Sequence, residues 1–167
     1  INSTDQLRSN EVNWSTHMKL ATLNTNTRDG ALLVVSRDLK SAVKTSQINA
    51  ELPQTAQALM DDWSMHEPAL SAIYDRLNAG TQEGAFEVDP TQLHSILPRA
   101  YAWIDGSAYI NHIVLVRKAR GAEPPATLKT DPLVYQGGSD TFLAPRSDIE
   151  LADLSWGCDF EAEIAVV

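Results

Sequence analysis

The hydrophobic pattern of the chain changes near its middle, and this change limits the fold more than any other feature. Between Pro53 and Gly80, apolar residues recur at the three- and four-residue spacing of helices that bury one face. Two sets follow this spacing: Ala56, Leu59, Met60 and Trp63, and then Leu70, Ile73, Tyr74 and Leu77. We therefore expect two amphipathic helices, the second beginning at Pro68 and ending at Gly80. His66 would then be a loop or capping residue between them.

The segments on either side of these helices favour β-structure. Lys19–Leu23 and Ala31–Ser36 flank an Asp29–Gly30 turn, which predicts a β-hairpin packed against the helices. In the second half, prolines and a Gly137–Gly138 pair interrupt short apolar runs, as is typical of a loop-rich β region. Residues 107–120 predict either one helix or a helix followed by a short strand. The fold class expected is α+β.

Charge and cysteine content exclude several classes of function. The 167 residues carry a formal net charge of −9, which would repel nucleic acids and anionic membranes. No apolar run approaches the roughly 20 residues of a membrane span. The single cysteine, Cys158, cannot form an internal disulfide, which suits a reducing compartment. We therefore expect a cytoplasmic protein with neither nucleic acid nor membrane as its partner.

Two glutamates, two residues apart, stand in the last apolar segment, Cys158–Val167. If this segment is a strand, Glu161 and Glu163 share one face and lie about 7 Å apart, because alternate side chains point the same way. A strand with one solvated face explains the pair without any function. Binding of both carboxylates to a hard divalent cation also explains it. The segment alone leaves both interpretations open.

Three motifs in the second half follow one another in a recognisable order. Asp105 is followed seven residues later by His112, Tyr135 stands in a Pro-x-x-Tyr-x-Gly turn, and Glu161-x-Glu163 comes last. Each motif is weak alone, but together they resemble the fumarylacetoacetate hydrolase family. The resemblance covers residues 18–167.

This resemblance implies a division into domains. Residues 18–95 correspond to the family's small N-terminal β/α domain, and residues 96–167 to the first part of its β-rich, mixed β-sandwich roll catalytic domain. The polar residues 1–17 show no periodicity, and we interpret them as a leader or an added extension. Because family members continue well beyond the Glu-x-Glu motif, we expect the chain to be part of a longer protein.

The resemblance also implies a metal site and a general base. Asp105, Glu161 and Glu163 correspond to three of the four carboxylates that hold Mg²⁺ or Ca²⁺ in the family. Oxygen ligands are what such hard cations require. His112 corresponds to the base that deprotonates a water for attack on a carbonyl group.

Substrate contacts are implied in the same way. Tyr135 corresponds to a tyrosine that contacts the substrate, and Arg117 or Arg120 to an arginine that binds its carboxylate. Without the resemblance, Asp105 could instead be a helix N-cap, Tyr135 a core residue and His112 a structural histidine. Where some members carry a tyrosine two residues after the first metal-binding Asp, this chain has Ser107, which leaves the substrate open.

The function expected from the resemblance is metal-dependent hydrolysis of a C–C bond in a small β-diketo acid. The substrate would be a fumarylacetoacetate-like or acylpyruvate-like acid from the catabolism of aromatic compounds, and the enzyme a homodimer. An alternative on the same fold is a 2-keto-4-pentenoate hydratase or a 2-keto acid decarboxylase. An alternative of another class is a non-catalytic fragment that binds metal or dimerises.

Overall fold

The structure, a computed structural model, describes residues 17–107, 109–158 and 160–167. The predicted leader, residues 1–17, therefore lies outside the described residues except for His17. Contacts between backbone positions divide the chain into two compact units. The first unit combines Ile1–Pro98 with Phe142–Val167, and the second unit is Arg99–Thr141. The predicted domain boundary between residues 95 and 96 stays a prediction.

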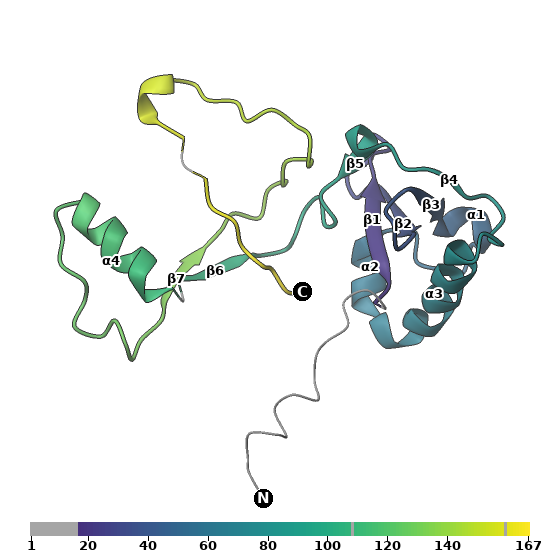
Figure 1. Cartoon of the computed structure of the whole chain (residues 1–167), viewed down its shortest axis with the longest axis horizontal. Coiled ribbons are helices and arrows are strands. Elements are labelled where there is room, and N and C mark those ends of the chain that lie inside the picture. The colour runs from purple at the N-terminus through teal and green to yellow at the C-terminus, as the bar shows by residue number, and fades with distance from the viewer. Residues whose placement is uncertain (1–16, 108, 159) are drawn as a thin grey trace, which may run out of the picture. The chain divides into compact units, whose positions relative to one another are not determined.

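The first unit contains a five-stranded sheet in the order β4-β3-β2-β1-β5, in which all neighbours are antiparallel. Its strands are β1 (Lys19–Leu23), β2 (Ala31–Val35), β3 (Ser41–Lys44), β4 (Phe86–Glu87) and β5 (Leu93–His94) (Figure 1). The predicted hairpin is confirmed, because Lys19 pairs with Val35 and Leu23 with Ala31. Strand β3 was not predicted, because its 4 residues include only two apolar side chains.

Three helices follow or flank these strands: α1 (Thr45–Ile48), α2 (Ala56–Asp61) and α3 (Trp63–Asn78). The prediction of two amphipathic helices is confirmed, but the boundary between them was wrong. The backbone of Asp62 leaves the helical region (φ −146°, ψ 55°), so α2 ends before it and Trp63 begins α3. Pro68 consequently lies inside α3. His66 is also in α3, and its predicted place in a loop was wrong.

Each face of the sheet carries a cluster of buried residues. On one face, residues of β2 and β3 pack with residues of α2 and α3 in a core of Leu32, Val34, Val43, Ala56, Leu59, Leu70, Ile73, Tyr74 and Leu77. The opposite face carries a second cluster around Leu33 and Val35. The connection from β4 to β5 must pass from one edge of the sheet to the other, and its Val88 packs on this second cluster. Burial on both sides explains why β2 is a continuous apolar run rather than an alternating one.

The second unit is built on a two-stranded antiparallel pair, β6 (Ile104–Ser107) and β7 (Leu133–Gln136). Helix α4 (Ile110–Ala119) lies between the two strands in the sequence. Of the two predictions for residues 107–120, the single helix is therefore confirmed. No helix in the described ranges is both long and apolar enough to cross a membrane.

The described residues of the segment Phe142–Val167 are irregular apart from a short 3-10 helix, Leu154–Trp156. The strand predicted for Cys158–Val167 was wrong, because residues 160–167 have no regular structure and belong to neither sheet. A strand is maintained by hydrogen bonds to a neighbouring strand, and its side-chain alternation depends on them. The shared face expected for Glu161 and Glu163 therefore has no backbone support. With helices and antiparallel sheets in one chain, the α+β fold class is confirmed.

Candidate functional site

The β6–β7 pair brings two of the predicted site residues together. Asp105 and Tyr135 are register partners, and residues directly opposite each other in an antiparallel pair share a face with their Cβ atoms about 5 Å apart. Asp105 is half-buried, whereas Tyr135 is 60% exposed. The alternative of Tyr135 as a core residue was therefore wrong. The N-cap alternative for Asp105 was also wrong, because Asp105 lies within β6 and Tyr109 occupies the N-cap of α4.

An aromatic residue that the sequence analysis missed adjoins this pair. The ring centroids of Trp103 and Tyr135 are 5.4 Å apart, and the ring planes are tilted by 55°. The backbone N–H of Gly137 donates a hydrogen bond of 2.9 Å to the carbonyl oxygen of Trp103. Strand periodicity was the available signal, since Trp103 precedes Asp105 by two residues and alternate residues share a face. Trp103 therefore belongs to the candidate site.

Helix α4 carries the predicted base and both predicted arginines. His112 lies in its first turn with an exposed side chain, which argues against a buried structural role. Arg117 lies in the last turn, and Arg120 is the C-cap. At 3.6 residues a turn, Arg117 is about 140° and Arg120 about 80° around the helix axis from His112. Arg117 therefore does not share the face of His112, whereas Arg120, at the C-cap, lies nearer to that face.

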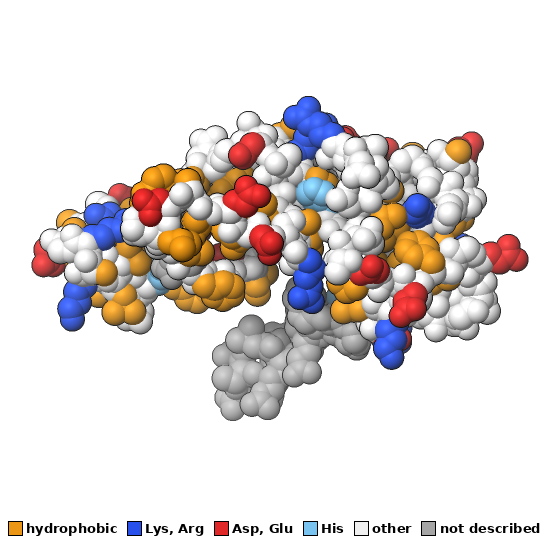
Figure 2. Space-filling model, turned by 90° about the horizontal axis from the view of Figure 1, so that it is seen from above, with side chains coloured by type: hydrophobic (Ala, Val, Ile, Leu, Met, Phe, Trp, Pro, Cys, Tyr) orange, Lys and Arg blue, Asp and Glu red, His pale blue; other side chains and the backbone are white. Residues whose placement is uncertain are grey.

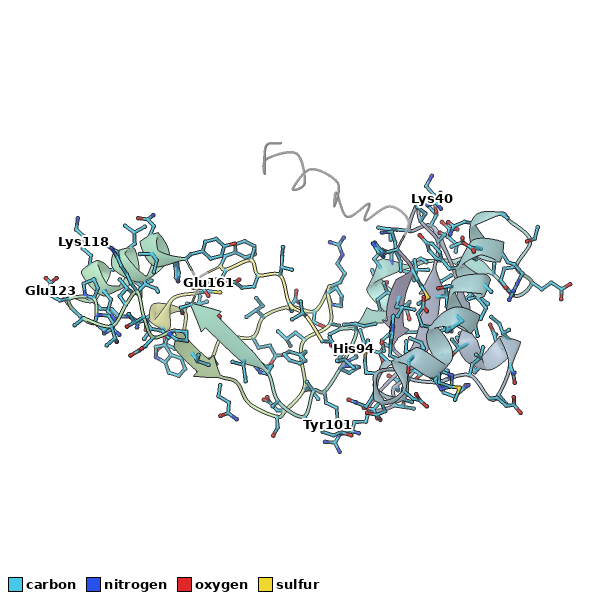
Figure 3. The ribbon with its side chains drawn as sticks, turned by 90° about the horizontal axis from the view of Figure 1, so that it is seen from below. Lys40, His94, Tyr101, Lys118, Glu123 and Glu161 are labelled. Carbon is cyan, nitrogen blue, oxygen red and sulfur yellow. The ribbon has the colours of Figure 1, made fainter. Side chains whose placement is uncertain are left out.

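Glu161 and Glu163 lie in the irregular segment 160–167, and both side chains are exposed. Glu161 is labelled in Figure 3. Asp105 belongs to the Arg99–Thr141 unit and the two glutamates to the other. The donor chemistry of the three residues fits a hard cation, because all are carboxylates. In the part of the chain that the structure describes, however, no group of three or more His, Cys, Asp or Glu residues is arranged to hold a metal ion.

Among the described residues, three carboxyl groups outside the candidate site have a lowered pKa. Hydrogen bonds from side-chain hydroxyls are the main cause: Ser36 lowers the pKa of Asp38, Thr91 that of Asp89, and Ser155 that of Asp153. Each partner lies two residues from its carboxylate, and all three carboxylates are exposed. These interactions stabilise turns and contribute nothing to the candidate site.

Comparison with known families covers nearly the whole chain. Residues 18–99 match the family model described as fumarylacetoacetase N-terminal domain 2, and residues 102–167 match the model described as fumarylacetoacetate hydrolase C-terminal. A search of curated proteins gave no match. The two domain matches stand in consecutive order and leave only residues 1–17 and 100–101 uncovered. The chain therefore belongs to the fumarylacetoacetate hydrolase family, whose domains are those of hydrolase- or lyase-type enzymes.

Proposed function

We propose that the protein is a metal-dependent hydrolase that cleaves a C–C bond in a β-diketo acid. The substrate class is fumarylacetoacetate-like or acylpyruvate-like acids from aromatic catabolism, in the cytoplasm. The observation that supports this most directly is the register of β6 and β7, in which Asp105 lies opposite Tyr135. A carboxylate and a phenol on one face suit a ligand that combines a metal-chelating head with a group that accepts a hydrogen bond.

The proposed roles of the protein's residues follow from their chemistry. Asp105, Glu161 and Glu163 would hold Mg²⁺ or Ca²⁺, which when bound supplies stabilisation of negative charge on substrate oxygens. Tyr135 would orient the substrate through its hydroxyl, and Arg117 or Arg120 would bind its carboxylate.

His112 would act as the general base, because removal of a proton from water makes the water nucleophilic. Its neutral imidazole accepts a proton from a water molecule, and the water oxygen forms a bond to the distal carbonyl carbon. The bond between that carbon and the adjacent methylene carbon then breaks, with its electron pair passing to the methylene carbon. The proton held by His112 can return to that carbon, so a carboxylic acid and a 2-keto acid leave. The exposed position of His112 in α4 gives water access to the ring.

Replacement of His112 tests the reaction. In the full-length protein with Mg²⁺ and an acylpyruvate, His112→Ala should lower kcat by about 10² or more, the usual contribution of a general base. Loss of the diketo absorbance gives the rate, and chromatography of the products identifies the reaction. His66→Ala, in a helix of the other unit, is the matched control and should retain activity. Unchanged turnover in His112→Ala would remove His112 from the mechanism, and products of hydration or decarboxylation would replace the hydrolase proposal.

Glutamine substitutions test the metal ligands. Glu161→Gln and Glu163→Gln keep the side-chain size but remove the charge, so each should weaken Mg²⁺ binding by about tenfold or more. Calorimetric titration of Mg²⁺ into the full-length protein measures this affinity. Glu150→Gln is the control, because Glu150 is an exposed carboxylate outside the proposed ligand set. Equal affinity in all four proteins would contradict the assignment.

The working enzyme is expected to be a homodimer. Many large apolar side chains are exposed from Tyr101 onward, among them Ile104, Val134, Leu154 and Trp156. Orange side chains are accordingly frequent in the left half of Figure 2. Exposed apolar area of this kind favours association. Light scattering coupled to size-exclusion chromatography should give twice the mass of one full-length chain, and a monomer at micromolar concentration would contradict the expectation.

A further inference from the structure

The indole ring of Trp103 rests on Gly137. A Cβ atom added to Gly137 would lie 1.8 Å from Cε2 and 2.1 Å from Nε1 of Trp103, distances at which atoms overlap. The φ angle of Gly137 is not in the positive range that L residues avoid, so backbone conformation does not require glycine there. The need for glycine at position 137 therefore comes from the close approach of the Trp103 ring.

Strand pairing sets this ring beside the candidate site. Asp105 pairs with Tyr135, and the hydrogen bond from the Gly137 N–H to the Trp103 carbonyl continues the pairing by two residues. Trp103 and Gly137 consequently share the face of Asp105 and Tyr135. The tilted contact between the rings of Trp103 and Tyr135, with centroids 5.4 Å apart, agrees with this arrangement.

The contact with Trp103 restricts the side-chain conformations of Tyr135. Tyr135 is 60% exposed, so solvent alone would leave several rotamers open to it. Trp103 is less exposed, at 37%, because its ring lies against Gly137. The Trp103 ring, which lies against Gly137, thus restricts the orientations open to the Tyr135 ring.

We infer that Trp103, seated on Gly137, is a positioning residue that holds Tyr135 in orientation beside Asp105. The inference rests on the proposed function, in which Tyr135 orients the substrate. Trp103 would act through Tyr135 and would not itself take part in bond breaking. Its loss should therefore weaken substrate binding more than it slows the chemical step.

Two alanine substitutions in the same strand pair separate the ring contact from general effects. Gly137→Ala should displace the indole, whereas Gly106→Ala places a Cβ where no described atom lies within 4 Å. In the full-length enzyme with Mg²⁺ and an acylpyruvate, Gly137→Ala and Trp103→Ala should each raise KM about fivefold, the size of an aromatic pair interaction, with kcat little changed. Gly106→Ala should match the wild type, and Trp103→Phe should restore most of the affinity.

A double-mutant cycle decides whether Trp103 acts through Tyr135. If it does, adding Trp103→Ala to Tyr135→Ala should raise KM no further, because the coupled partner is already gone. Multiplicative losses in the double variant, or a wild-type KM in Gly137→Ala, would overturn the inference.

A spectroscopic measurement keeps the inference testable if the proposed function fails. Absence of diketo acid cleavage by the wild type would refute the proposed function alone. In a full-length variant in which every tryptophan except Trp103 is replaced by Phe, including Trp14, Trp63 and Trp156, the fluorescence of Trp103 should change with Gly137→Ala and with Tyr135→Ala but not with Gly106→Ala. An emission spectrum unaffected by Gly137→Ala would show that the indole does not rest on Gly137, and the inference would be wrong.

Discussion

Gly30 ends the turn between β1 and β2, and its replacement by alanine should be among the most costly glycine substitutions in the first unit. Its φ of 63° lies in the left-handed region, which costs an L residue about 1–2 kcal/mol. An added Cβ would also lie 2.5 Å from Cγ2 of Thr22 and 2.6 Å from the carbonyl oxygen of Leu23. Neither neighbour can yield easily. Thr22 is fully buried and its hydroxyl donates a 2.6 Å hydrogen bond to the carbonyl of Ile96, while the Leu23 oxygen is part of the β1 backbone.

Gly80 provides the matched control for this substitution. Its φ of 72° imposes a similar backbone cost, but an added Cβ meets no described atom within 4 Å. In both variants, alanine restricts the unfolded chain more than glycine does, and this effect stabilises the folded protein by about 0.4–1 kcal/mol. We therefore expect Gly80→Ala to lose about 1 kcal/mol of unfolding free energy. Gly30→Ala should lose about 3 kcal/mol, since overpacking adds about 1–3 kcal/mol.

Urea unfolding followed by far-UV circular dichroism measures both losses in the full-length protein. With a slope of about 2 kcal/mol per molar urea, the Gly30→Ala midpoint should fall by about 1.5 M and the Gly80→Ala midpoint by about 0.5 M. Hydrogen–deuterium exchange should place the added opening of Gly30→Ala in β1 and β2. Equal losses in the two variants would refute the reasoning, because the close contacts of Gly30 would then carry no energetic cost.

Two further predictions concern a buried hydroxyl and an exposed carboxylate. Tyr74 is 2% exposed and its hydroxyl has no hydrogen-bond partner among the described residues, so Tyr74→Phe should leave the unfolding free energy unchanged or raise it by about 1 kcal/mol. Tyr109→Phe, at a 73% exposed position, is the control, and a clear loss in Tyr74→Phe would show that the hydroxyl has a partner. The hydroxyl of Ser36, at 2.6 Å, and then the N–H of Lys40 hold the pKa of Asp38 below its ordinary value. Because the folded pKa is lowered, this stabilisation is full above the unfolded pKa and is lost as pH falls through the folded value. Asp38→Asn should thus unfold at lower urea than the wild type at neutral pH and at the same urea in acid, and a difference independent of pH would contradict this.

Local pattern was enough to predict the first unit in most respects. The Asp29–Gly30 turn and its flanking strands predicted the hairpin, and the helical spacing predicted α2 and α3. The predicted boundary between the two helices was wrong. The chain leaves the helical conformation at Asp62, and Pro68, a residue that usually favours a helix start, lies inside α3. Pairing partners were also beyond prediction, since the placement of β4 and β5 at opposite edges depends on contacts distant in sequence.

In the candidate site too, residue spacing could be predicted from the sequence, whereas contacts that depend on strand pairing could not. The seven-residue interval from Asp105 to His112 can be read from the sequence, but the position of Tyr135 opposite Asp105 requires the register of β6 and β7. Trp103 was missed for this reason, because its role depends on Gly137 in the other strand.

For Glu161 and Glu163, the spacing was known from the sequence but the strand that it implied is absent from the described residues of that segment. Their two-residue spacing defines a common face only when the backbone is held extended by a neighbouring strand, and residues 160–167 belong to neither sheet. A cation bound by both carboxylates would supply such a constraint by itself, since both side chains must then converge on one point. Under the proposed function, metal binding would therefore be linked to order in this segment. The two glutamine substitutions that are expected to weaken Mg²⁺ binding should also abolish any protection of residues 160–167 from hydrogen exchange that Mg²⁺ confers.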